Sequence, residues 1–284
     1  MLILLNMDNI ISCLDHGYIK YIGHYGSDKE IVASARISTG GSNKTEEEDR
    51  KLINYLMKNR HNSVFEMADI TFEVQAPIFV FRELMRHRTL TWFSINELSG
   101  RYSEMPSLFY VPDDSRYGKQ GKINKQGTSE LLGEEVKRKL KWDIENEQID
   151  ARTAYEQKLA SGLSREIARI NLPLSQYSRM RIKGNLLNWF RFIDLRSRPN
   201  AMWEIQQYSD AIFKVLEELF PWSVAAFREH WFESINISKS EKDALVAILN
   251  DITYDKLYNA LSLQGVKKPE DLLAKIGVNN DKIN

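Results

Sequence analysis

Residues 68–102 read ADITFEVQAPIFVFRELMRHRTLTWFSINELSGRY. At the start of this stretch, Ile70, Phe72 and Val74 alternate with polar residues, which is the pattern of a strand with one buried face. Pro77 ends the strand and suits the first turn of a helix that carries Arg86-His87-Arg88 at its end. A strand followed directly by a helix predicts an α/β fold, and we expect helices packed on an antiparallel or mixed sheet.

The second half of the stretch concentrates polar groups that ordinary core cannot hold, because every buried polar group needs a hydrogen-bond partner. They lie in Arg86–Arg88 and in Asn96–Arg101, and large apolar residues such as Leu84, Trp92 and Phe93 stand between them. We therefore expect a half-buried segment. A ligand with phosphates and a hydrogen-bonding ring would satisfy these groups, and a solvated charged loop is the alternative.

Composition excludes several classes of protein. The chain has 284 residues, of which 43% are hydrophobic, and this indicates a globular protein. Lys+Arg and Asp+Glu both number 39, so no net basic field recruits nucleic acid. The single cysteine, Cys13, excludes an intramolecular disulfide and fits a reducing compartment. Met1–Leu5 is apolar but short, and we expect a first strand rather than a signal peptide. No run is long enough to cross a membrane, and we expect a cytoplasmic protein.

Periodicity along the rest of the chain predicts further elements. A strand is predicted over 180–183 and a mobile loop over 112–127. Helices are predicted over 30–36, 45–59, 129–161, 203–220, 238–249, 253–263 and 269–276. This pattern predicts one larger domain over 1–236 and a helical C-terminal extension over 237–284. The extension is interpreted as a surface appendage, with an oligomer contact or a partner-binding module as the alternative.

The polar stretch closely resembles the signature of the flavin-dependent thymidylate synthases, which is RHR, a spacer, and a serine in an N-E-x-S-x-R-Y run. Asn96, Glu97, Ser99, Arg101 and Tyr102 match that run in order and spacing. Further landmarks of the family follow in family order: Ala35–Ser38, His61–Phe65, Ala76–Phe79, Arg165–Arg169, Leu172–Leu174, Asp194–Arg196 and Trp203–Tyr208. The resemblance covers roughly residues 8 to 232.

The resemblance implies FAD-dependent reductive methylation of dUMP to dTMP, with methylenetetrahydrofolate and NADPH as co-substrates. It also implies a homotetramer with active sites at subunit interfaces. The family uses no protein nucleophile, and Cys13 lies among apolar residues without a flanking cation, so we expect a buried structural thiol. Neither a G-x-G-x-x-G run nor a P-loop is present, so a pocket specific to the family would have to hold the flavin.

The resemblance also implies roles for individual residues. Arg196 is the expected catalytic residue, a cation that favours negative charge on the pyrimidine. The expected nucleotide-binding residues are Glu83, Arg86, Glu97, Leu98, Ser99, Gly100, Arg101, Arg169 and Arg196. The expected FAD-binding residues are His61, Ser63, Arg86, His87, Arg88, Glu97, Asn185 and Arg191. An arginine guanidinium can donate two parallel hydrogen bonds to phosphate oxygens. The histidines are scattered along the chain, so we expect no metal site.

Three departures from the family pattern concern the flavin side. The spacer 89–93 is about three residues longer than expected, and Trp92 or Phe93 is predicted either to line the ligand cleft or to pack into the core. Leu187 stands where an arginine is often found, and Arg191 stands where an asparagine usually contacts FAD. Arg191 replaces the missing cation in one interpretation, and the flavin pocket is altered in the other.

Other functions stay open at this level. The same scaffold could act on UMP or dCMP, or add a different one-carbon unit. A nucleic-acid-binding module using Arg86, Arg88 and Arg101 is disfavoured by the zero net charge. A third alternative is an enzyme remnant kept for assembly through its C-terminal extension.

Overall fold

The computed structural model describes residues 10–38, 40–41, 45–87, 94–122, 126–249, 252–266 and 268–278. The chain divides into two compact units, residues 1–233 and 234–284. The larger unit is built on a five-stranded sheet in the order β1-β2-β3-β7-β4, and every neighbouring pair is antiparallel. The strands are β1 (Ile10–Cys13), β2 (Gly17–Tyr25), β3 (Asp69–Pro77), β7 (Tyr177–Asn185) and β4 (Ser94–Glu97). The expected α/β fold with helices on an antiparallel sheet is confirmed.

The two central strands pair along their whole length, from Asp69 opposite Asn185 to Pro77 opposite Tyr177. In β3, the alternating residues Ile70, Phe72 and Val74 are buried, as the period of two predicts. The strand predicted over 180–183 is longer, because β7 extends over nine residues. Its exposed face carries charged side chains, and this weakens the hydrophobic signal of its ends.

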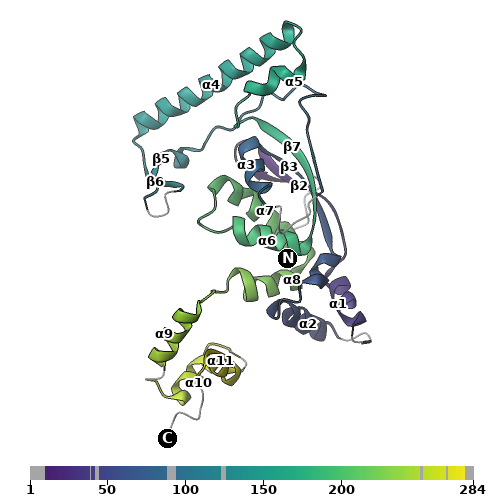
Figure 1. The fold of residues 1–284 in the computed structure, drawn as a ribbon, viewed down its shortest axis with the longest axis vertical. Coiled ribbons are helices and arrows are strands. Elements are labelled where there is room, and N and C mark those ends of the chain that lie inside the picture. The colour runs from purple at the N-terminus through teal and green to yellow at the C-terminus, as the bar shows by residue number, and fades with distance from the viewer. Residues whose placement is uncertain are drawn as a thin grey trace. The chain divides into compact units, whose positions relative to one another are not determined.

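Helices cover one face of the sheet. The larger unit contains α1 (Asp28–Ile37), α2 (Glu46–Lys58), α3 (Ile78–Leu84), α4 (Glu134–Ala160), α5 (Arg165–Ala168), α6 (Leu186–Arg196), α7 (Trp203–Leu219) and α8 (Pro221–Phe227). Of these, α3, α6 and α7 contact the strands of the sheet. Short 3₁₀ turns are η1 (Asn62–Met67), η2 (Asp114–Arg116) and η3 (Arg169–Asn171), and η4 (Arg228–Phe232) is a π-helical turn. Figure 1 shows α6 and α7 together beside the central strands. Trp189 of α6 packs edge-on against Phe72 of β3, with ring centroids 5.1 Å apart.

Two predictions in the middle of the chain are wrong in part. The loop predicted over 112–127 contains η2 and strand β5 (Gly118–Gln120), which pairs with β6 (Thr128–Leu131). The long helix therefore begins at Glu134 and not at residue 129, because the first of those residues are in the hairpin. The helix predicted over 203–220 is α7, and Pro221 then starts α8, at a position that proline tolerates well.

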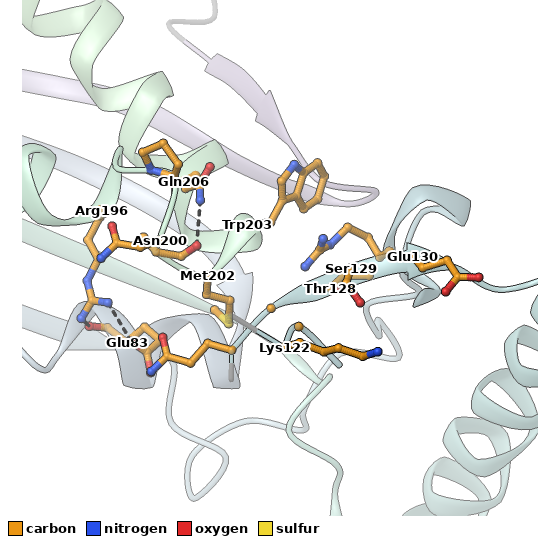
Figure 2. Close-up of a pocket in the computed structure, with 16 residues that line it drawn as sticks. Glu83, Lys122, Thr128, Ser129, Glu130, Arg196, Asn200, Met202, Trp203 and Gln206 are labelled. Atoms are coloured by element: carbon orange, nitrogen blue, oxygen red, sulfur yellow. Dashed lines mark hydrogen bonds and ion pairs between the residues drawn. The ribbon is translucent and has the colours of Figure 1, made fainter. Parts of the chain in front are cut away.

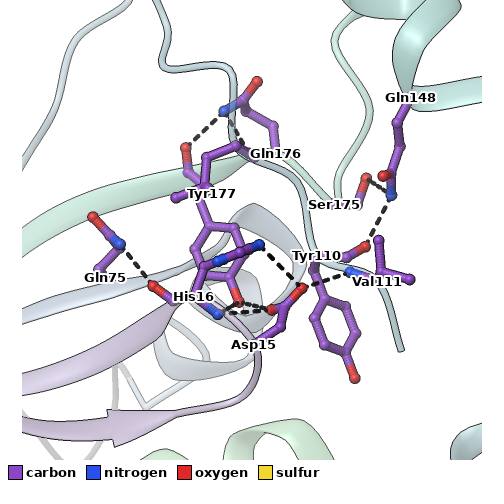
Figure 3. A network of polar contacts seen from close by, with 10 residues as sticks. Asp15, His16, Gln75, Tyr110, Val111, Gln148, Ser175, Gln176 and Tyr177 are labelled. Carbon is purple, nitrogen blue, oxygen red and sulfur yellow. Dashed lines mark hydrogen bonds and ion pairs between the residues drawn. The ribbon is translucent and has the colours of Figure 1, made fainter. Parts of the chain in front are cut away.

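A polar network ties the segment before this hairpin to the sheet (Figure 3). The hydroxyl of Tyr177 donates to Asp15 Oδ1 at 2.5 Å, and the backbone N–H of Val111 donates to Asp15 Oδ2 at 2.9 Å. Gln75 Nε2 donates to the carbonyl oxygen of His16 at 2.7 Å. Burial, reinforced by the Asp15 carboxylate, raises the pKa of Tyr177 well above its ordinary value, so this hydroxyl keeps its proton and its donor role.

The smaller unit consists of α9 (Lys239–Leu249), α10 (Tyr254–Leu263) and α11 (Pro269–Ile276), which confirms the three helices predicted there. A capping box precedes α9: Ser238 Oγ accepts from the backbone N–H of Glu241 at 3.3 Å, and Glu241 Oε2 accepts from the backbone N–H of Ser238 at 2.7 Å. Across the described parts of both units, every helix is too short or too polar to cross a membrane.

Candidate active site

Arg196, the last residue of α6, meets the end of α3 through three contacts. Its Nη1 pairs with Glu83 Oε2 at 2.9 Å, and its Nη2 donates to the main-chain oxygen of Glu83 at 3.3 Å. Its Nε donates to His87 Nε2 at 2.8 Å. The guanidinium is therefore held on two sides by residues that the chain places just after or within the last turn of α3.

His87 is 5% exposed and contacts Phe192 of α6 edge-on, with ring centroids 5.1 Å apart. Burial, and then the positive charge of Arg196, lower the pKa of His87 to about 4. The ring is consequently neutral at neutral pH. A neutral ring that accepts at Nε2 carries its proton on Nδ1.

A cleft of about 1200 Å³ opens beside Arg196 (Figure 2). Figure 2 shows Arg196 and Glu83 on one side and hairpin residues on the other, with the start of α7 between them. The hairpin and α7 contribute Lys122, Thr128, Ser129, Glu130, Trp203 and Gln206 to the lining. Of the predicted site residues, Glu83 and Arg196 line this cleft.

Glu97–Arg101 leaves the sheet at the end of β4 and forms a turn. Glu97 accepts from the hydroxyl of Ser178 at 2.8 Å, and Ser99 Oγ accepts from the backbone N–H of Arg101 at 3.3 Å. Gly100 is buried, and a Cβ at this position would lie 2.7 Å from Cδ of Arg169. The glycine thus allows Arg169 to lie against the turn, so the structure brings these predicted phosphate-binding residues together.

The predicted flavin residues His61, Ser63, Asn185 and Arg191 lie on or beside η1, β7 and α6, which contact one another at the other end of the sheet. Asn185 pairs with Asp69, the residue at which β3 begins directly after η1, and η1 contains Ser63. The side chain of Asn185 also caps α6, because its Oδ1 accepts from the backbone N–H of Asn188 at 2.9 Å. Arg191 follows on the same helix and is half-buried.

Two observations fit a bound cofactor that carries both hydrogen-bond donors and negatively charged groups. Asn62 Oδ1, between His61 and Ser63, is buried without a hydrogen-bond partner in the described part of the chain, so a ligand that donates a hydrogen bond would satisfy it. Arg86 is exposed, and the ion pairs formed among the described residues do not involve it, so its guanidinium can receive a phosphate. Arg88 and the spacer 89–93 with Trp92 and Phe93 lie outside the described residues.

Leu187, at the position where the family pattern was expected to have an arginine, is completely buried in the core. It therefore cannot be replaced by a cation without placing an unpaired charge in an apolar environment. The half-buried Arg191 lies one helical turn further along α6.

A buried carboxylate beside the cleft was not predicted from the sequence. Glu204 accepts from Arg116 Nε at 2.9 Å and from the hydroxyl of Tyr110 at 3.2 Å, and the Arg116 guanidinium lies 5.0 Å from the ring centre of Trp203. Burial, and then the charge of Glu204, raise the pKa of Tyr110 well above its ordinary value. The family landmark Trp203–Tyr208 contains Glu204 and could have drawn attention to it. Its partners Tyr110 and Arg116 come from a distant segment of the chain, so the sequence does not reveal the contacts.

Cys13 offers no nucleophile. It is 4% exposed, and burial raises the pKa of its thiol to about 12. The thiolate, which is the reactive form, is therefore scarce at neutral pH. The expectation of a buried structural thiol is confirmed.

Comparisons with known proteins agree with the geometry. The model of the family described as thymidylate synthase complementing protein matches residues 20–222. A flavin-dependent thymidylate synthase of Thermus thermophilus is 42% identical, covering 92% of this chain and 94% of the relative. A flavin-dependent thymidylate synthase of Treponema denticola is 38% identical, covering 84% of this chain and 89% of that protein.

The crystal structure of a UMP/dUMP methylase, PolB from Streptomyces cacaoi bound with 5-Br dUMP, superimposes with a TM-score of 0.68 at 33% identity. The match covers 77% of this chain and 97% of PolB. The part of this chain outside the Thermus alignment is shorter than residues 234–284, so that similarity extends into the smaller unit. By its family match and its relatives, the chain belongs to the flavin-dependent thymidylate synthase family, within the thymidylate synthase complementing proteins.

Proposed function

We propose that the chain converts dUMP to dTMP by reductive methylation, with FAD as its cofactor and methylenetetrahydrofolate and NADPH as co-substrates. Family membership supports the activity, and the position of Arg196 at the wall of the cleft is the structural observation that carries it. When bound, the reduced flavin supplies the hydride. No protein nucleophile takes part, which agrees with the buried, protonated thiol of Cys13.

Arg196 acts on the pyrimidine in this proposal. Its side chain is 18% exposed, so the guanidinium reaches the cleft while most of it stays shielded from water. A shielded cation stabilises negative charge that develops on the ring carbonyl and nitrogen more strongly than a solvated one. Glu83, which is 38% exposed in the same cleft, can accept a hydrogen bond from a ring N–H.

The remaining predicted residues divide between the two ends of the sheet. Leu98, Ser99, Gly100, Arg101 and Arg169 would hold the phosphate of the nucleotide, because a buried glycine lets backbone and guanidinium groups approach the same oxygens. The residues that would hold FAD are His61, Ser63, Arg86, Arg88, Glu97, Asn185 and Arg191, whereas His87, which the family resemblance also implied for FAD, is buried and hydrogen-bonded to Arg196.

We also propose that the enzyme is a homotetramer with active sites at subunit interfaces. Among the predicted site residues, only Glu83 and Arg196 line the cleft in the described part of one chain, and the phosphate and flavin groups lie elsewhere on the sheet. A second copy of the chain would bring these groups to one ligand. Residues 1–236 form the catalytic domain and 237–284 the helical extension in this proposal, and the enzyme is cytoplasmic.

Turnover with dUMP, UMP and dCMP in parallel tests the substrate. We expect dUMP to be preferred, because the chain is more similar to the Thermus thymidylate synthase than to PolB. A preference for UMP or dCMP would contradict the proposal. Sedimentation tests the assembly, and a monomer at micromolar concentration with FAD present would contradict the homotetramer.

The Arg196→Ala variant tests the catalytic role. Loss of a hydrogen bond to a charged group costs about 1.5–3 kcal/mol, so we expect kcat to fall about 10- to 100-fold while FAD stays bound. Arg50→Ala is the matched control, since its guanidinium forms an exposed pair with Glu46 on α2. Normal turnover in Arg196→Ala would refute the role.

A further inference from the structure

We propose that His87 is a positioning residue for Arg196: its Nε2 accepts the Nε–H of the guanidinium at 2.8 Å and thereby directs the remaining N–H groups toward the cleft. The inference rests on the proposed function of Arg196. It adds a role for His87 that differs from the flavin contact implied by family resemblance.

The Arg196 guanidinium has few hydrogen-bond acceptors other than His87 in the described part of the chain. Besides His87, its described partners are the carboxylate of Glu83 at 2.9 Å and the main-chain oxygen of Glu83 at 3.3 Å. Both belong to one residue, which lies at the edge of the cleft (Figure 2). Without an acceptor for Nε–H, the guanidinium could rotate about its last side-chain bonds and face Glu83 alone. The third contact removes this freedom.

A neutral imidazole differs from a carboxylate in how it affects the charge of Arg196. A carboxylate in the place of His87 would also accept the Nε–H, but together with Glu83 it would place two negative charges on the one guanidinium that has to present positive charge to the pyrimidine. An imidazole accepts the hydrogen bond without adding a negative charge. Burial and the adjacent guanidinium keep the ring unprotonated at neutral pH, because they lower the pKa of His87 to about 4. The ring thus orients the cation without adding a second negative charge to that of Glu83.

The ring of His87 is held in a fixed position by its neighbours. His87 is 5% exposed, its ring packs edge-on against Phe192, and its backbone N–H donates to the carbonyl oxygen of Leu84 at 3.3 Å. Phe192 lies one helical turn before Arg196 on α6, so the helix that carries the guanidinium also holds the ring that orients it. The acceptor therefore has a defined position before any ligand arrives.

Two variants separate positioning from flavin binding. His87→Leu removes the acceptor with little change in volume, whereas His87→Gln places an amide oxygen near the position of Nε2. We measure bound FAD by its absorbance, and kcat and KM for dUMP, on the full-length enzyme. We expect both variants to retain FAD, His87→Leu to lose about 10- to 100-fold in kcat, and His87→Gln to recover to within a few-fold of the parent. In an Arg196→Ala background, His87→Leu should cause no further loss.

Three results would overturn the positioning role: normal kcat in His87→Leu, equal losses in the two variants, or loss of FAD from both. A crystal structure of His87→Leu provides a readout independent of turnover, and we expect the Arg196 guanidinium to have rotated toward Glu83. An unchanged guanidinium would also overturn the inference. If the parent enzyme does not turn over dUMP, the proposed function fails, and this structural comparison still decides the role of His87.

Discussion

Acidification provides a prediction that follows from the burial of His87 and needs no substrate. Its pKa falls from an ordinary value of 6.5 to about 4 in the folded chain. Between these two values the unfolded chain binds a proton that the folded chain does not, so the free energy of unfolding decreases as the pH falls. The stabilisation is complete above pH 6.5 and is lost progressively toward pH 4.

The magnitude follows from the same two values. One unit of pKa displacement corresponds to about 1.4 kcal/mol, and integrating the proton uptake from about pH 7 to about pH 5 gives a loss of about 2 kcal/mol. Below pH 4 this residue contributes no further loss, because both states are then protonated. The physical cause is that burial disfavours the charged ring, and the positive charge of Arg196 beside Nε2 disfavours it further.

The assay is urea unfolding followed by tryptophan fluorescence at about pH 7, 6 and 5, at one protein concentration and one FAD concentration. The matched variant is His87→Gln, which keeps an acceptor but cannot be protonated in this range. Other titrating groups contribute equally to both proteins, so the difference between them isolates His87. We expect the parent to lose about 2 kcal/mol more than the variant between about pH 7 and about pH 5. Parallel losses in the two proteins would refute the reasoning.

Three further predictions concern residues away from the cleft. Gly17→Ala should destabilise the chain by about 3 kcal/mol, because the new Cβ would lie 2.0 Å from the hydroxyl of Tyr208. Gly23→Ala in the same strand has no atom within 4 Å of its Cβ and serves as the control, and equal melting temperatures for the two variants would contradict the clash. Asp28→Ala should lower the free energy of unfolding by about 2 kcal/mol, since the carboxylate accepts two backbone N–H groups at the start of α8 at 2.7 and 3.1 Å. An unchanged urea midpoint would show that these bonds contribute nothing. Cys13→Ala should retain dUMP methylation, and a variant that binds flavin and nucleotide normally but does not turn over would disprove the nucleophile-free mechanism.

Local patterns in the sequence determined much of the architecture. The period of two over Ile70, Phe72 and Val74 predicted β3, and the helical period over 45–59 and 238–249 predicted α2 and α9 to within about one residue of their observed starts. These features depend on residues within a few positions of one another, so the sequence by itself contains their cause. The motif Asn96–Arg101 likewise identified the family, because it is contiguous in the chain.

Contacts between distant residues were decided by the tertiary structure. The hairpin of β5 and β6 was taken for a loop and the start of a helix, because its strands are short and polar and only their pairing stabilises them. The sequence could place His87 between two arginines, but not against Arg196, which is 109 residues further along the chain. That contact requires α3 and α6 to end side by side, and their packing against the sheet depends on the whole core. The sequence therefore identifies the residues of the site. Their hydrogen-bond partners and protonation states are determined only when the chain is folded.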